Sequence, residues 1–104
     1  KGVANQVGGG ELKSLRWAIK ERVRFSAGRV ESRTWEEYPI LTFGEVPPVE
    51  VTLLDRPEEP WLGAGEASMG PTAAALGNAV ADALGVRVRD LPLTSDAIVA
   101  AMSS

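Results

Sequence analysis

The chain of 104 residues contains neither cysteine nor histidine. Without cysteine it can form no disulfide, bind no metal through thiolates and offer no thiol nucleophile. Without histidine it cannot assemble a Ser-His-Asp triad or the usual zinc site from its own residues. Any chemistry must therefore use carboxylates, backbone groups or a borrowed cofactor.

Positive charge and long apolar runs are also scarce. The formal net charge is −3, with basic and acidic residues interspersed, which argues against nucleic-acid binding. No apolar run approaches the roughly 20 residues that span a bilayer, and no secretory signal is visible. The chain opens at Lys1-Gly2-Val3 without an initiator methionine, so we expect a fragment of a longer protein, of unknown compartment.

The remaining composition is that of an ordinary globular protein, with 44% hydrophobic and 24% charged residues. Its length fits one small domain, residues 1–104, with a modest core. Three segments have apolar residues at helical spacing, and residues 1–10 before them are small and glycine-rich, which predicts a loop. The predicted helices are 11–25, ended by Ser26-Ala27-Gly28; 72–84, ended by Gly85; and 96–102, capped by Thr94 or Ser95.

Strand signals are shorter. Val49, Val51 and Leu53 alternate with polar residues, which predicts a strand over 49–54. Segments 29–35 and 86–88 are further short candidates, and 38–43 is extended but irregular because it contains a proline. Strands and helices do not alternate as in a parallel βαβ array. The predicted fold class is α+β, with two to three helices packed on a short, mainly antiparallel sheet.

The segment Gly63-Ala64-Gly65-Glu66-Ala67-Ser68-Met69-Gly70 carries the most chemical information. Its glycines allow close approach of a bulky group, and the helix start behind it offers unpaired N–H groups. Acidic residues are common near helix N-termini, so a structural role for Glu66 is the alternative interpretation. No Gly-x-Gly-x-x-Gly follows a strand and no Gly-Lys-Ser/Thr follows, so phosphate-loop and dinucleotide folds are disfavoured.

Several separated motifs occur in a recognisable order. They are Gln6-Val7-Gly8-Gly9-Gly10, Tyr38-Pro39-Ile40, Glu45-Val46-Pro47-Pro48-Val49-Glu50-Val51, Pro60-Trp61-Leu62-Gly63-Ala64-Gly65-Glu66, Ala75-Leu76-Gly77-Asn78-Ala79-Val80 and Gly85-Val86-Arg87-Val88-Arg89-Asp90-Leu91-Pro92-Leu93. Together they resemble the C-terminal part of the molybdopterin-binding domain in the large subunit of the xanthine dehydrogenase and aldehyde oxidase family. Within that family, the isoquinoline 1-oxidoreductase β-subunit type is the most similar.

The resemblance implies specific site residues. Glu66 matches the catalytic general base of a family that hydroxylates an N-heteroaromatic or aldehyde substrate with water-derived oxygen. Partial burial would raise the pKa of such a carboxylate toward the working pH. Gly63 and Gly65 match positions where the backbone approaches the cofactor. Gln6 matches the glutamine of the family's Gln-x-Glu-Gly-Gly loop, but Gly8 replaces the glutamate, so a solvated loop residue is the alternative for Gln6.

The resemblance also implies partners. The full-length enzyme would carry molybdopterin in its cytosine dinucleotide form and work with a separate small subunit that holds two [2Fe-2S] clusters. Since this chain has no cysteine for such clusters, a divided electron path is consistent. The isolated fragment is expected to be inactive and to bind no cofactor, metal or nucleic acid, and its exposed apolar surface could drive self-association. The alternative function is a non-catalytic interaction or scaffold domain that keeps the fold.

Overall fold

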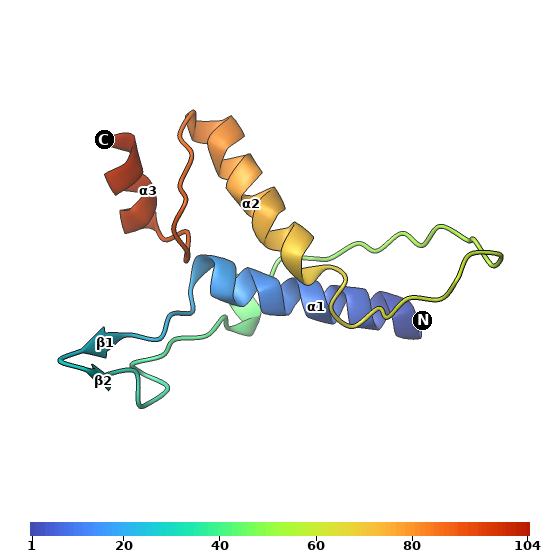
Figure 1. Ribbon diagram of the computed structural model, residues 1–104, viewed down its shortest axis with the longest axis horizontal. Coiled ribbons are helices and arrows are strands. Elements are labelled where there is room, and N and C mark those ends of the chain that lie inside the picture. The colour runs from blue at the N-terminus through green and yellow to red at the C-terminus, as the bar shows by residue number, and fades with distance from the viewer.

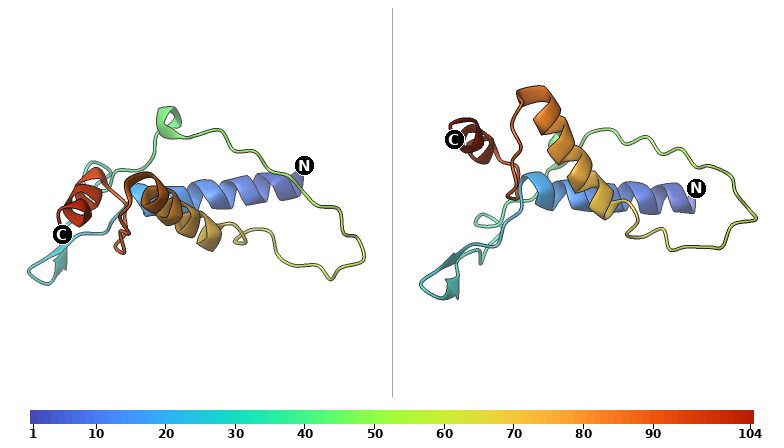
Figure 2. Two further views of the ribbon diagram at one scale, coloured as in Figure 1. Left: turned by 90° about the horizontal axis from the view of Figure 1, so that it is seen from above. Right: turned by 45° about the horizontal axis from the view of Figure 1, so that its top comes forward.

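The computed structural model describes residues 1–104 and contains three α-helices and one small antiparallel sheet, so the predicted α+β class is confirmed. The α-helices are α1 (Gly2–Ile19), α2 (Met69–Leu84) and α3 (Ser95–Met102), and a 3-10 turn, η1, spans Phe43–Glu45. Figures 1 and 2 show α2 starting beside the middle of α1 and leading away from it. No helix is both long and apolar enough to cross a bilayer.

Helix α1 differs from the prediction at both ends. It begins at Gly2, so the loop predicted for residues 1–10 is wrong, and it ends at Ile19 rather than Phe25. Residues beyond Ile19 leave the helix because the chain turns back in a hairpin of β1 (Phe25–Ser26) and β2 (Arg29–Val30). Ala27 and Gly28 form the hairpin turn with positive φ, as two-residue hairpin loops require, instead of ending a helix.

Two other helix ends follow the prediction. Gly85 stops α2 in the left-handed conformation with φ of 68°, and its N–H donates to the Ala81 carbonyl. Thr94 caps α3, where its hydroxyl accepts a 3.2 Å hydrogen bond from the Ala97 N–H. These ends depend on one or two residues of local chemistry, which explains why the sequence predicts them.

The strand predicted for 49–54 does not form, and neither does the one for 86–88, while 29–35 contributes only Arg29–Val30. Residues 49–54 are extended, but no neighbouring strand lies beside them to complete a ladder. Between Val46 and Ala64 the only hydrogen bond runs from the Glu59 N–H to the Arg56 carbonyl, at 3.2 Å. This segment forms a long loop that projects past the N-terminus in Figure 1.

The core is small and lies along α1. Its buried apolar side chains are Leu15, Ala18 and Leu93, and the Leu93 N–H donates a 2.7 Å hydrogen bond to the Ala18 carbonyl. This bond ties the loop before α3 to the C-terminal end of α1. Most other large apolar side chains remain exposed, including Trp61 and Leu62 at 96% and 92%.

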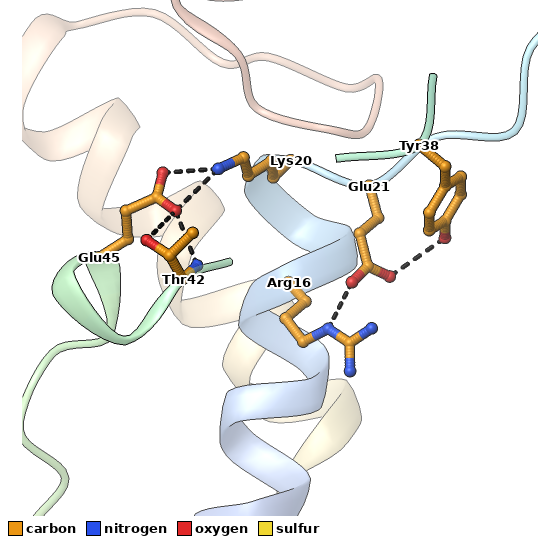
Figure 3. A network of polar contacts seen from close by, with 6 residues as sticks. All are labelled: Arg16, Lys20, Glu21, Tyr38, Thr42 and Glu45. Atoms are coloured by element: carbon orange, nitrogen blue, oxygen red, sulfur yellow. Dashed lines mark hydrogen bonds and ion pairs between the residues drawn. The ribbon is translucent and has the colours of Figure 1, made fainter. Parts of the chain in front are cut away.

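Polar contacts hold the hairpin region and η1 to the end of α1 (Figure 3). Arg16 pairs with Glu21, which also accepts a 3.1 Å hydrogen bond from the Tyr38 hydroxyl. Lys20 Nζ donates to both carboxylate oxygens of Glu45, at 2.6 and 2.8 Å. Glu45 Oε2 also accepts from the Thr42 N–H and hydroxyl, which closes a capping box.

The Glu45 contacts give a prediction for acid titration. Hydrogen bonds from Lys20 and then from the Thr42 N–H and hydroxyl lower the pKa of Glu45 from 4.5 to about 2. Because the folded pKa is depressed, the η1 contact contributes stability above pH 4.5 and loses it as the pH falls toward 2. A carboxyl-carbon NMR titration should therefore place the Glu45 midpoint near 2, and Lys20→Met should move it upward.

The matched control is Lys13→Met, which removes a lysine of α1 that forms no ion pair and should leave the Glu45 titration unchanged. A Glu45 midpoint close to 4.5 in the unaltered chain would contradict the contact.

Candidate functional site

The segment that carries Glu66 docks on α1. Gly65 to Ser68 forms the turn before α2, and the N–H of Met69, the first residue of α2, donates to the Glu66 carbonyl at 3.1 Å. Ser68 Oγ donates a 2.8 Å hydrogen bond to the Val7 carbonyl, and Ser14 Oγ donates to the Met69 carbonyl. Two side-chain hydrogen bonds thus connect this turn to α1 across more than fifty residues of sequence.

Small residues on α1 make the close approach possible. Gly10, Ser14 and Ala18 follow one another at intervals of four, which places them on one face of the helix. All three are buried, with Ser14 and Ala18 at 0% exposure. A Cβ added to Gly10 would lie 2.7 Å from Ser68 Oγ and 3.0 Å from the Gly65 carbonyl oxygen. The turn therefore lies directly on the helix at Gly10.

The first turn of α2 offers fewer free N–H groups than its sequence indicated. Ser68 is the N-cap residue, but its hydroxyl bonds to α1 instead of capping α2. The Met69 N–H is bonded to the Glu66 carbonyl, and Pro71 has no N–H. Thr72 Oγ1 donates to the Ser68 carbonyl at 2.6 Å. The turn is thus organised to dock on α1 rather than to leave a ring of unpaired donors.

The structure places the four predicted site residues on either side of this contact. Gln6 lies on α1 beside Val7, whose carbonyl receives the Ser68 hydroxyl. Gly65 rests against Gly10, and Glu66 follows it with an exposed side chain. Gly63 precedes the anchored turn and has open space around it. The structure therefore brings the Gln6 to Gly10 motif against the Gly63 to Glu66 motif.

The exposure of Glu66 departs from the partial burial expected of a catalytic base. Glu66 is exposed in this chain, so further burial must come from polypeptide or cofactor outside these residues. No group of three or more acidic side chains gathers in a way that could bind a metal ion. The candidate site within this chain thus consists of one carboxylate, that of Glu66, on a turn that is held against α1 and contains Gly65.

Sequence reasoning missed Gly10, Ser14 and Ser68. Three successive glycines indicated a loop, which concealed the helical spacing of Gly10 with Ser14 and Ala18. A pattern of small residues every four positions is a signal for close packing, and it could have predicted this face. The identity of the partner segment could not have been read from the pattern.

An apolar groove lies next to the anchored turn. It has a volume of about 490 Å³ and runs between α1, α2 and the extended segment at Pro47–Val49. Leu12, Leu15, Val49, Ala75, Leu76 and Ala79 supply its apolar lining, and Ser68 lies at its wall. The apolar face of α2 is therefore only partly covered by other residues of this chain.

Comparison with known proteins identifies related polypeptides, among them the following two. The chain is 43% identical over 102 residues to the B component of nicotinate dehydrogenase from Pseudomonas putida, a match that covers 98% of this chain and 9% of that protein. It is 30% identical over 91 residues to the isoquinoline 1-oxidoreductase β-subunit of Brevundimonas diminuta, covering 88% of this chain and 12% of that protein. No protein-family model matches the chain.

These relatives support the resemblance at the level of oxidoreductase subunits. Both are named as subunits of oxidoreductases, so the chain is homologous to a segment of such a subunit. The chain spans only about a tenth of the length of the curated relatives it matches. Neither the isoquinoline type nor the site residues are tested by this similarity, and both stay predictions.

The docking contact gives a prediction for Ser14→Ala. Removing the hydroxyl takes away one part-buried hydrogen bond to the Met69 carbonyl, which costs about 0.5–1.5 kcal/mol. We expect the first turn of α2 to lose about that much protection in amide hydrogen exchange of the full-length protein. Ser103→Ala is the control, since the Ser103 hydroxyl is exposed and bonds within its own helix. Equal exchange in the two variants would show that the bond contributes nothing.

Proposed function

We propose that residues 1–104 form the C-terminal part of the molybdopterin-binding domain in the large subunit of a molybdenum hydroxylase. In this proposal Glu66 is the general base. The observation that carries it is the contact between the Gln6 to Gly10 and Gly63 to Glu66 motifs, which the family resemblance places together near the cofactor. The identity to two oxidoreductase subunits over nearly the whole chain supports the same assignment.

The substrate we propose is an N-heteroaromatic ring, with an aldehyde as the second candidate. Nicotinate and isoquinoline, which appear in the names of the two relatives, are both nitrogen heteroaromatics. Hydroxylation replaces a C–H bond by a C–OH bond with oxygen from water and releases two electrons and two protons. In this proposal the electrons leave through a separate small subunit with two [2Fe-2S] clusters, with which the absence of cysteine from this chain is consistent.

The residues present fit a large organic cofactor. A Cβ at Gly63 or Gly65 would meet nothing within 4 Å, so the backbone there is open to a bulky neighbour. Gln6 is exposed on α1 next to the docked turn and could hydrogen-bond such a group. The cofactor implied by the resemblance is molybdopterin in its cytosine dinucleotide form, which would supply the redox chemistry when bound.

Glu66 would contribute proton transfer. An ionised carboxylate accepts a proton from water-derived oxygen as the bond to the ring carbon forms. Its turn is anchored to α1 through Ser68 and Ser14, so the main chain at Glu66 is held while the side chain is free to face the reacting group.

The extent of exposed surface supports a large partner, the remainder of the same subunit. The accessible area is 8162 Å² and the radius of gyration is 16.6 Å. A monomeric globular protein of this mass exposes about 5,600 Å², so the excess is roughly 2,500 Å². Permanent interfaces bury on the order of 2,000–5,000 Å² summed over both partners, so an excess of this size on one side is enough for such an interface. The unpaired segment 49–54 would then complete a sheet with a strand from that polypeptide.

The alternative is a non-catalytic interaction or scaffold domain with the same fold. It is favoured by the exposed apolar groove and by the exposure of Glu66, neither of which requires chemistry. The contact between the Gln6 to Gly10 motif and the motif that ends in Glu66 favours the enzyme instead.

Glu66→Gln in the full-length enzyme with its small subunit distinguishes the two. The amide keeps the size of the side chain but cannot accept the proton, so turnover of N-heteroaromatic substrates should fall by at least about a thousandfold. Molybdenum content, measured by elemental analysis, should stay at the wild-type level. The control is Glu58→Gln, an exposed acid of the long loop outside the docked turn. Unchanged turnover in Glu66→Gln would leave the scaffold alternative.

The unpaired segment gives a separate prediction for the interface. In the isolated chain, the amides of Val51, Thr52 and Leu53 should exchange with solvent without protection, since none is hydrogen-bonded. In the full-length subunit they should be protected by at least about tenfold through strand pairing. The amides of 56–58, in the surface turn, should stay fast in both. Equal exchange of 51–53 in the two proteins would contradict the interface.

A further inference from the structure

Gly10 occupies the point where α1 comes closest to the turn that carries Glu66. Its Cα faces Ser68 and the Gly65 carbonyl, and the space that a Cβ would need is already occupied. Gly9, the next residue of the same helix, would meet nothing within 4 Å, and Gly8 would meet only Val49 Cγ1 at an ordinary 3.8 Å. Of the three successive glycines, Gly10 alone is required by packing.

The neighbours of Gly10 cannot yield without moving the turn. Ser68 Oγ, 2.7 Å from the position of the added Cβ, would have to give up its hydrogen bond to the Val7 carbonyl to move away. The Gly65 oxygen, at 3.0 Å, is main chain and directly precedes Glu66. A side chain at position 10 would therefore displace the backbone at Glu66.

We propose that Gly10 is a positioning residue, which sets the place of the Glu66 carboxylate through the Gly65 carbonyl and the Ser68 hydroxyl. This inference rests on the proposed function of Glu66 as the base. Gly10 is buried against the turn, and it acts by letting the turn lie against α1 where Ser68 and Ser14 hold it. Small errors in the placement of a base lower the rate of proton transfer more than they weaken substrate binding.

The first measurement is structural and does not depend on activity. Hydrogen exchange of residues 65–72 is compared in the full-length subunit for Gly10→Ala and Gly9→Ala. Both changes replace a helical glycine by alanine and raise helix propensity alike, so only the contact differs. We expect at least tenfold faster exchange at the Met69 and Thr72 amides in Gly10→Ala alone. Equal exchange in the two variants would overturn the contact.

The second measurement is kinetic, on the holoenzyme with its small subunit. We expect Gly10→Ala to lower kcat per bound molybdenum by tenfold or more, with KM changed less than twofold. Gly2→Ala, at an exposed helical glycine outside both motifs, should match the wild type. A merely structural role would lower thermal stability or cofactor content and leave kcat per molybdenum unchanged, which would overturn the proposal.

A second variant covers the case in which Gly10→Ala does not fold. Ser68→Ala removes the bond to Val7 without adding bulk, so it should lower kcat per molybdenum severalfold at unchanged KM, and unchanged kcat would count against positioning. Glu66→Gln separates a failure of the proposed function from a failure of the positioning inference. If Glu66→Gln keeps full turnover, the proposed function fails. If it abolishes turnover while Gly10→Ala and Ser68→Ala do not reduce it, only the positioning inference fails.

Discussion

The close contact between α1 and the turn before α2 is the interaction on which the rest of the chain depends. Three glycines in a row disfavour a helix, each by roughly 1 kcal/mol relative to alanine. Helix α1 nevertheless runs through them, and at Gly10 it gains a surface on which Gly65 and Ser68 can lie. The same missing side chain that weakens the helix locally thus lets two distant motifs meet, and tertiary packing decides the conformation.

Features determined by local chemistry could be predicted from the sequence. Gly85 ends α2 and Thr94 caps α3 because a single residue supplies the left-handed conformation or the hydroxyl acceptor. The start of α1 could not be predicted, because its helical state depends on contacts with a segment more than fifty residues away. The strand at 49–54 was wrong for a related reason: the alternating pattern is present, but a strand needs a partner that this chain does not contain.

The candidate site likewise has some features that the sequence can predict and others that only the fold determines. The sequence motif singles out Glu66, Gly63 and Gly65 as candidates, because residue type and spacing can be read directly from the sequence. It cannot reveal that the Ser68 hydroxyl bonds to Val7 rather than capping its own helix, or that Ser14 bonds to the Met69 carbonyl. An N-cap serine has two competing uses, and only the approach of α1 decides between them. The hydrogen bonds that hold the turn on α1 therefore depend on the fold, whereas the candidate residues can be recognised from the motif.

Glu66 lies where a loop with few hydrogen bonds meets a turn that is hydrogen-bonded to α1. Residues 46–64 before it make one hydrogen bond among themselves and expose Trp61 and Leu62, whereas Gly65 to Met69 is fixed to α1 on several sides. The main chain on the C-terminal side of Glu66 is therefore held on α1. The loop on its N-terminal side is open to any polypeptide that packs on it. The anchored half can supply the precision that proton transfer needs. The loop of residues 46–64 can be buried only by polypeptide outside this chain. The reactivity of Glu66 would therefore depend both on α1 and on the polypeptide that covers this loop.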